Sequence, residues 1–323
     1  MFINRSGAGL LFGNCTGFKE TEIMNWKNIF IIGAAALLPV TGMSQANILN
    51  AKKPDEIGVR TQEQKDIDND APLDYGYVDD RDILWSKTVW EIIDLDERVN
   101  FPMYYPVDTV DIGSDRRSLY DVLMRNIKSG KLEDVYVDSY FTEKRKYSDL
   151  TATLQKVDTT DLGYEQLNAG EELSPEYVNR RALDAADIVE YRIKGIWYFD
   201  KRMGELKYRL LGIAPVAPDV NFIEDESMAP EDALVELFWV WYPSARRILH
   251  DAKVFNARNS AMPISFDMLL NARRFNAVIY KEDNVHGDRE IRDYIADNAL
   301  FQLLESKRIK ETIRDREQDM WAY

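Results

Sequence analysis

The sequence is poor in cysteine and histidine, with one Cys (Cys15) and two His (His250 and His286) in 323 residues. A single cysteine cannot form an intramolecular disulfide, and so few thiols and imidazoles exclude a zinc site built from Cys and His. A His-based catalytic triad would have to use one of these two histidines, and the sequence has no Gly-x-Ser-x-Gly turn. The stability of the fold therefore has to come from packing.

Positive charge is also scarce, because 41 Lys and Arg stand against 56 Asp and Glu and give a formal net charge of −15. Nucleic-acid binding needs clustered Lys and Arg to pair with phosphates, so this balance argues against a nucleic-acid partner. The sequence also lacks a P-loop, a Gly-x-Gly-x-x-Gly turn after a strand, a His-Glu-x-x-His motif and the protein-kinase motifs. We therefore assign no catalytic, cofactor-binding or metal-binding residue.

Core-forming residues are abundant, since 45% of the chain is hydrophobic and 11% aromatic. The clearest pattern lies at 189–210, where apolar and polar residues alternate on both sides of Gly204 and predict an antiparallel hairpin with one buried face. Residues 83–95 and 235–242 are rich in β-branched and aromatic side chains and favour strands. The predicted fold class is α+β, with antiparallel hairpins and short sheets packed against helices.

Helix-capping residues mark further elements. Ser118 is expected to cap a helix that ends at Gly130, and Pro175 is expected to open a helix that runs to about Asp187. Residues 142–172 are polar and lack a clear period, which predicts an irregular insertion. A helix is also expected at 266–275, followed by a strand at 277–280.

Residues 288–323 are predicted to form a helical C-terminal segment. Leu300, Leu304, Ile309 and Ile313 indicate an apolar stripe, and Lys or Arg alternate with Asp or Glu around it. A salt-bridged surface helix and a partner-binding helix both fit this pattern. For the aromatic loop before Pro106, burial in the core and an exposed interface are both open. The interface candidates are Tyr104, Tyr105, Arg308, Ile309 and Ile313.

The N-terminal region is predicted to contain a leader that is cleaved off, followed by an extended arm. Residues 24–46 combine a positive start, an apolar run of about 12 residues and a small-residue ending, as in a secretory signal peptide. We expect cleavage between Ala46 and Asn47, and a retained membrane anchor is the alternative. Residues 1–23 would then be a mis-annotated extension. Residues 47–80 are polar and acidic and predict an extended arm.

The predicted core, 81–287, contains a weak internal repeat. Residues 81–141 and 233–287 share the order strand, short helix, helix, strand, and they flank a helix and hairpin at 174–218. Such a pattern is consistent with an α+β protein built from two similar halves that pack together, although few identities support it.

An ordered set of segments carries a family resemblance. The segments are Val89-Trp-Glu-Ile-Ile-Asp-Leu, Asn100-Phe-Pro-Met-Tyr-Tyr-Pro106, Ser118-Leu-Tyr-Asp-Val-Leu-Met, Trp239-Val-Trp-Tyr-Pro243, Val254-Phe-Asn-Ala-Arg-Asn259, Ser265-Phe-Asp267, Arg273-Arg-Phe275 and Ile279-Tyr-Lys-Glu-Asp283. Together they resemble the GldN/PorN family of gliding motility and type IX secretion proteins of the Bacteroidetes, in which GldO is a close paralogue.

The resemblance implies a non-enzymatic structural subunit of the periplasm. Members of the family are expected to form a ring with the outer-membrane lipoprotein GldK/PorK and to engage the periplasmic part of the inner-membrane motor protein GldM/PorM. The family implies no catalytic residues. The residues alone leave open a periplasmic hydrolase that uses a carboxylate pair, or a carbohydrate-binding protein, because acidic pairs and clustered tryptophans are present.

Overall fold

The computed structural model describes residues 71–108, 116–170, 175–220, 234–256, 263–296 and 298–321, with the single residues 53 and 259. The described elements belong to one compact unit, Ala71–Tyr323. The predicted extension 1–23, the signal peptide 24–46, the cleavage site at Ala46 and Asn47, and nearly all of the arm before residue 71 lie outside the described residues.

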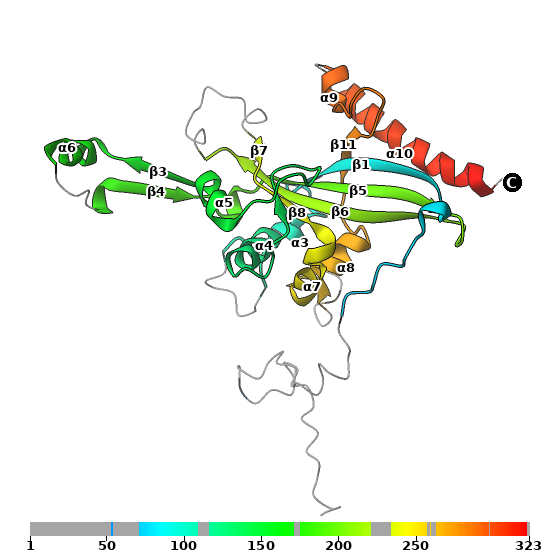
Figure 1. Ribbon diagram of the computed structural model, residues 1–323, viewed down its shortest axis with the longest axis horizontal. Helices are drawn as coiled ribbons and strands as arrows, with labels where there is room; N and C mark the ends of the chain where they lie inside the picture. The colour runs from blue at the N-terminus through cyan, green and yellow to red at the C-terminus, as the bar shows by residue number, and fades with distance from the viewer. Residues whose placement is uncertain are drawn as a thin grey trace, which may run out of the picture. The chain divides into compact units, whose positions relative to one another are not determined.

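A seven-stranded antiparallel sheet forms the centre of this unit, in the order β11-β1-β5-β6-β8-β2, with β7 paired to β6 (Figure 1). Its strands are β1 (Ile83–Asp94), β2 (Val135–Tyr136), β5 (Glu190–Asp200), β6 (Glu205–Pro218), β7 (Leu234–Glu236), β8 (Trp239–Trp241) and β11 (Val278–Glu282). The hairpin β5–β6 pairs Asp200 with Glu205 across the turn at Gly204, whose φ is +66°. The predicted α+β class and the antiparallel hairpin are confirmed. The expectation of a single buried face is wrong, because consecutive residues such as Tyr198 and Phe199 are both buried and the hairpin is covered on both faces.

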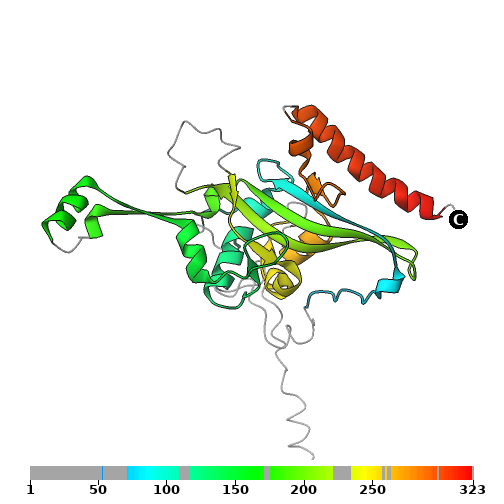
Figure 2. The same cartoon turned by 45° about the horizontal axis from the view of Figure 1, so that its top comes forward.

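Four helices pack on one face of the sheet, below it in Figures 1 and 2: α3 (Phe101–Tyr104), α4 (Leu119–Lys128), α7 (Tyr242–Asp251) and α8 (Phe266–Asn271). The predicted cap is present, because the Ser118 Oγ accepts from the Asp121 N–H at 3.2 Å. Leu123 of α4 and Leu249 of α7 join Ile193 and Ile213 of the sheet in the main hydrophobic core. A two-stranded ribbon, β9 (Lys253–Val254) with β10 (Ile264–Ser265), leads into α8.

The helices α9 (Ile291–Tyr294) and the long α10 (Ala299–Trp321) lie along the β11–β1 edge of the sheet, above β1 in Figure 1. Here Ile309 and Ile313 pack with Val89, Ile279 and Ile291 in a second hydrophobic cluster. The predicted helical C-terminal segment is therefore present. No described helix is both long enough and apolar enough to cross a membrane.

The expectation of an irregular insertion at 142–172 is wrong, because its described residues, 142–170, form regular elements. The region contains α5 (Tyr147–Leu154), β3 (Gln155–Thr159) and α6 (Asp161–Ala169). The expected helix from Pro175 to Asp187 is also wrong, because 3₁₀ turns at Pro175–Tyr177 and Ala185–Asp187 flank β4 (Val178–Ala182), which pairs with β3. Most of β4 is exposed, so these strands lack the apolar alternation that marks a half-buried strand.

Two other helix boundaries differ from the sequence expectation. The helix expected at 266–275 ends at Asn271, because Arg273 adopts a left-handed backbone conformation with a φ of 49°. A 3₁₀ turn at Asp80–Asp82 directly precedes the sheet, whereas the sequence predicts an extended acidic arm up to residue 80.

The two segments that share an internal pattern are interleaved in one sheet. The last strand of the first segment, β2, pairs with β8 of the second segment. The last strand of the second segment, β11, pairs with β1 of the first. The central hairpin β5–β6 lies between them. Both segments therefore contribute to one sheet, and their origin by duplication stays a prediction.

Candidate functional site

The long helix α10 is anchored to the edge strand β11 by polar and apolar contacts. The Ile279 N–H donates to the Ser306 Oγ at 3.0 Å, and the Lys310 Nζ donates to the carbonyl of Ala277. Burial lowers the pKa of Lys310. Ile309 and Ile313 are only 1% and 5% exposed. These two interface candidates thus pack within the chain, and a partner of α10 has to contact other side chains.

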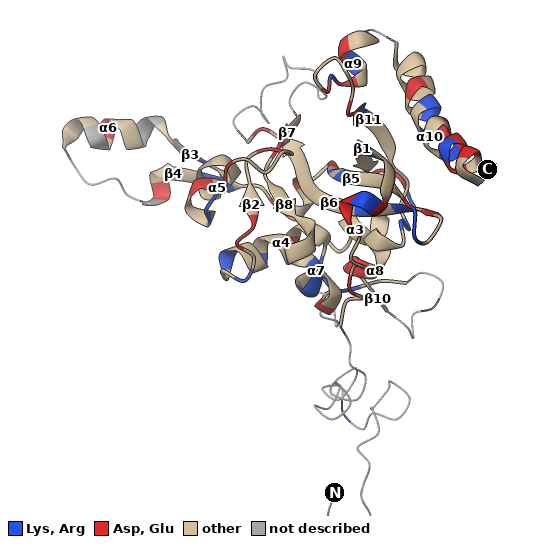
Figure 3. Ribbon diagram, turned by 45° about the vertical axis from the view of Figure 1, so that its right-hand side comes forward, with Lys and Arg blue, Asp and Glu red and all other residues tan. Residues whose placement is uncertain are grey.

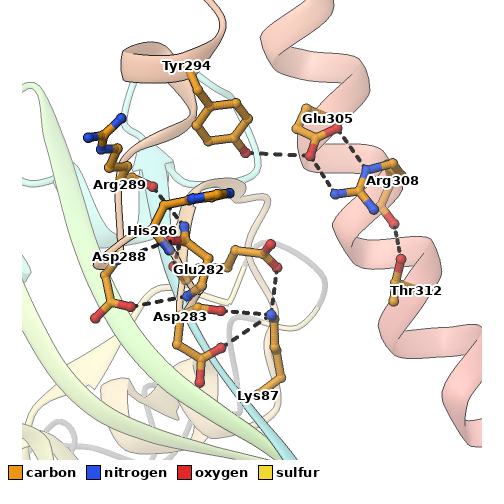
Figure 4. Close-up of polar contacts among 11 residues, drawn as sticks. Lys87, Glu282, Asp283, His286, Asp288, Arg289, Tyr294, Glu305, Arg308 and Thr312 are labelled. Carbon is orange, nitrogen blue, oxygen red and sulfur yellow. Dashed lines mark hydrogen bonds and ion pairs between the residues drawn. The ribbon is translucent and has the colours of Figure 1, made fainter.

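A cleft of about 810 Å³ opens where α9 and α10 pass the start of β1 and the loop after β11. Trp85, Ser86 and Lys87 line it from β1, and Tyr294, Glu305 and Arg308 line it from the helices. Figure 4 shows Lys87 and Arg308 on different sides of the site, each held by carboxylates of its own side. The candidate residue Arg308 is the only one of the five sequence candidates among the lining residues of this cleft.

The Lys87 ammonium lies among acceptors from the end of β11. Its Nζ is 3.2 Å from the Glu282 Oε2 and 3.4 Å from the Asp283 Oδ1, and it donates to the Asp283 carbonyl at 2.8 Å. Lys87 therefore ties the first half of β1 to the loop that follows β11. This contact fixes one wall of the cleft.

The other wall carries an Arg–Glu pair within one turn of α10. The Arg308 guanidinium donates to both carboxylate oxygens of Glu305, at 2.6 and 2.8 Å, and this hydrogen bonding lowers the pKa of Glu305. Burial raises the pKa of Tyr294 to about 12, so its hydroxyl stays protonated at neutral pH and faces Glu305 at 3.5 Å. Figure 3 shows Lys or Arg positions interspersed with Asp or Glu positions along the ribbon of α10.

The loop between β11 and α9 is closed by reciprocal hydrogen bonds. The Asn284 N–H donates to the Asp288 carboxylate, and the Asp288 N–H donates to the Asn284 side-chain oxygen, both at 3.1 Å. The Tyr140 hydroxyl donates to the same aspartate at 2.9 Å. This loop holds Val285, which is 95% exposed, and His286 at the cleft.

The chemistry of the cleft suits binding by fixed charges. Among the described residues no group of three or more His, Cys, Asp or Glu side chains is arranged to hold a metal ion. The carboxylates of Glu282, Asp283, Asp288 and Glu305 each contact a cation or a hydroxyl group of the chain. The cleft therefore presents charges held in place at the side of a β-sheet.

The start of α10 adds an exposed apolar patch that the sequence analysis did not separate from the buried stripe. The predicted apolar stripe of the helix includes Leu300 and Leu304, but only the C-terminal half of this stripe packs against β11. Exposed apolar groups of this size on one helix turn are characteristic of protein-binding surfaces. The members of this α10 patch, with their exposed fractions, are Leu300 (64%), Phe301 (57%), Leu303 (54%) and Leu304 (49%).

The aromatic candidates lie elsewhere, at the end of α3. The Tyr104 hydroxyl donates to the Ala186 carbonyl at 3.1 Å, and its ring packs against the main core. Tyr105 is 52% exposed, and its ring contacts Tyr104 edge-on at a centroid distance of 4.8 Å. The structure thus leaves Tyr105 accessible to a partner and does not bring it to the cleft.

A polar cluster that sequence reasoning missed anchors the end of the predicted arm. The Arg246 guanidinium pairs with the buried Asp267 carboxylate at 3.0 and 3.2 Å and lies over the Tyr75 ring at 4.1 Å. The Tyr75 hydroxyl donates to the Asn271 Oδ1 at 2.7 Å. A tyrosine within an otherwise acidic stretch was the only available signal. The described end of the arm is therefore attached to α7 and α8.

Comparison with known proteins places these features in one family. No curated protein matches the chain. The family model for gliding motility associated protein GldN matches residues 78–322, which is more than half of the chain and includes the seven-stranded sheet, the cleft and α10. The match begins just before β1 and extends to the end of the described helix α10. The chain therefore belongs to the GldN family of gliding motility associated proteins.

Proposed function

We propose that this chain is a non-enzymatic structural subunit of the type IX secretion and gliding motility machinery. Membership of the GldN family carries the proposal, because it connects the chain to gliding motility over the whole described sheet and α10. The leader-like sequence at 24–46 supports export to the periplasm, where the subunit would lie at the inner side of the outer membrane.

The proposed assembly is a ring of several copies with an outer-membrane lipoprotein of the GldK/PorK kind. The periplasmic part of the motor protein GldM/PorM would contact this ring. A subunit of this type needs at least two contact surfaces, and the α10 patch and the exposed Tyr105 supply apolar and aromatic side chains on two separate elements. Aromatic anchors often dominate the energy of such contacts.

Deletion of the gene in a gliding bacterium, with complementation by the full-length chain, tests the proposal. We expect the deletion to stop gliding and to block export of many surface proteins at once, with both restored by the complementing gene. A hydrolase or a carbohydrate-binding protein would instead affect one class of substrate. Loss of a single activity with gliding and bulk export intact would contradict the proposed function.

A further inference from the structure

The strand β1 has one edge that is paired along its whole length and one edge that is paired only in part. On the β5 side, pairing runs from Ile83 to Asp94. On the β11 side, pairing covers only Val89 to Ile92. Among the described residues, the edge of 83–87 on the β11 side therefore has no strand partner.

The backbone direction at this edge follows from Thr88. The Thr88 carbonyl accepts from the Asp283 N–H at 3.1 Å, so its polar backbone groups point to the β11 side. In an antiparallel strand the N–H and C=O of one residue point to the same side, and alternate residues share that side. Ser86 therefore directs both of its backbone groups to the same open edge, and Ser86 lines the cleft.

The helix α10 makes this edge one wall of an open groove. Its contacts at Ser306 and Lys310 hold it on β11, and the cleft of about 810 Å³ separates Glu305 and Arg308 from β1. In Figure 4 no hydrogen bond or ion pair joins Lys87 to the residues of α10. An extended segment that enters the cleft would therefore contact the unpaired edge of β1 on one side and side chains of α10 on the other.

The charge of the cleft selects the kind of segment that fits. Its lining includes four carboxylates and two cations, which leaves an excess of two negative charges, and the whole chain carries −15. A partner with positive charge is favoured by such a field, and an acidic one is disfavoured. The chain's own predicted arm at 47–80 is acidic and fits poorly. Trp85 and the exposed Val285, which also line the cleft, supply apolar contact beside these charges.

We propose that the free edge of β1 at Ile83–Lys87 binds an extended segment of a partner protein, in which basic and apolar residues alternate, by β-strand addition. Main-chain hydrogen bonds to Ser86 would supply affinity, as in other cases of strand addition, and the acidic lining would supply specificity for basic side chains. Alternate residues of the added strand point to opposite faces, so its basic side chains share one face and its apolar ones the other.

Two labelled peptides test the proposal on the chain from residue 47 to 323. Acetyl-Lys-Val-Lys-Val-Lys-Val-amide is the probe, and the same peptide with Glu in place of Lys is its control. Fluorescence anisotropy should show the basic peptide binding at least about tenfold more tightly than the acidic one, a difference of about 1.4 kcal/mol. Absence of binding at millimolar peptide, or equal binding of both peptides, would overturn the proposal.

The variant Ser86→Pro removes the backbone donor at the edge, and Ser86→Ala keeps it. The basic peptide should lose at least about tenfold in affinity with the proline variant and keep its affinity with the alanine variant. Hydrogen exchange on the unmodified chain gives an independent measurement if the proline variant does not fold. The amides of 84–88 should become protected when the basic peptide is bound, and binding without that protection would overturn strand addition.

Discussion

The backbone N–H of Ile279 on β11 donates to the Ser306 side chain on α10 at 3.0 Å. Ser306 is 2% exposed, so the bond is shielded from water. An edge strand normally leaves such amides unpaired, and a covering helix is one of the ways in which proteins protect them. Here α10 is held on β11 and passes the first half of β1 across the cleft lined by Ser86, Lys87, Glu305 and Arg308.

Replacement of Ser306 by alanine should destabilise the fold by about 1–3 kcal/mol, because it leaves the Ile279 N–H buried without an acceptor. The free energy of unfolding in urea measures this loss. Lys307→Ala is the matched control on the same helix, since the Lys307 side chain is 70% exposed. The control should change stability by less than about 0.5 kcal/mol. Equal stability of both variants would show that the Ile279–Ser306 bond does not hold α10.

A buried ion pair lies near the same helix. The Glu91 side chain on β1 is 1% exposed, and the Arg273 Nη2 lies 2.8 Å from its Oε1. The Arg273 guanidinium also lies over the Tyr208 ring at a distance of 4.2 Å. The pair therefore connects β1 to the segment after α8 through a buried charge.

Replacing one partner of this pair should cost far more than replacing both. Arg273→Met leaves the Glu91 carboxylate buried without its cation and should lower the free energy of unfolding by about 3–5 kcal/mol. The double variant Glu91→Leu with Arg273→Met should recover most of that loss. A double-mutant cycle by urea unfolding measures the coupling. If the two single effects simply add, the ion pair does not act as a unit.

The Tyr75 contact should give the chain a specific alkaline pH dependence. Burial raises the pKa of Tyr75 from 10.0 to about 12. Because its folded pKa lies above its unfolded pKa, the stabilisation is complete below pH 10 and is lost as the pH rises through 12. The stability advantage of the unmodified chain over Tyr75→Phe should therefore shrink between pH 10 and pH 12, as measured by chemical unfolding. Parallel pH curves for the two proteins would contradict this role of the hydroxyl.

The α10 patch should matter for assembly and not for folding. The variant Phe301→Ser with Leu304→Ser removes two exposed apolar side chains, so its free energy of unfolding should stay within about 0.5 kcal/mol. Binding to the proposed lipoprotein partner should weaken at least about tenfold if the patch is a contact surface. Leu73→Ser with Met203→Ser is the control, because both side chains are exposed, at 86% and 62%. If the α10 variant binds the partner with unchanged affinity in a titration, the patch is not part of the interface.

The parts of the fold that were predicted from sequence are those with a local signal. The alternation around Gly204 specified the β5–β6 hairpin, and Ser118 specified the start of α4. The pairing of β3 with β4 could not be predicted, because Val157 and Arg180 are brought together across 23 positions and both strands are largely polar. A local sequence pattern indicates the type of one element and which of its faces is apolar. It does not indicate which distant segment packs against that face.

The same limit explains the cleft. The sequence identifies Arg308 as one of several charged residues on an amphipathic helix. Its position beside the open edge of β1 depends on how α10 packs against β11, which the sequence pattern does not specify. The stripe from Leu300 to Ile313 is uniform in sequence, but only Ile309 and Ile313 pack against Val89, Ile279 and Ile291 of the distant elements. Tyr75 was read as part of an acidic arm because its partners, Arg246 and Asn271, are more than 170 residues away in sequence.

We propose that the chain is a ring subunit, and the mass of the complex that it forms provides the decisive test. Residues 47–323 would be coexpressed with the GldK/PorK-type lipoprotein partner, and the particle would be weighed by light scattering after gel filtration. We predict one species that contains both chains and is many times heavier than their combined mass. Separate small species at every protein and salt concentration would contradict the account.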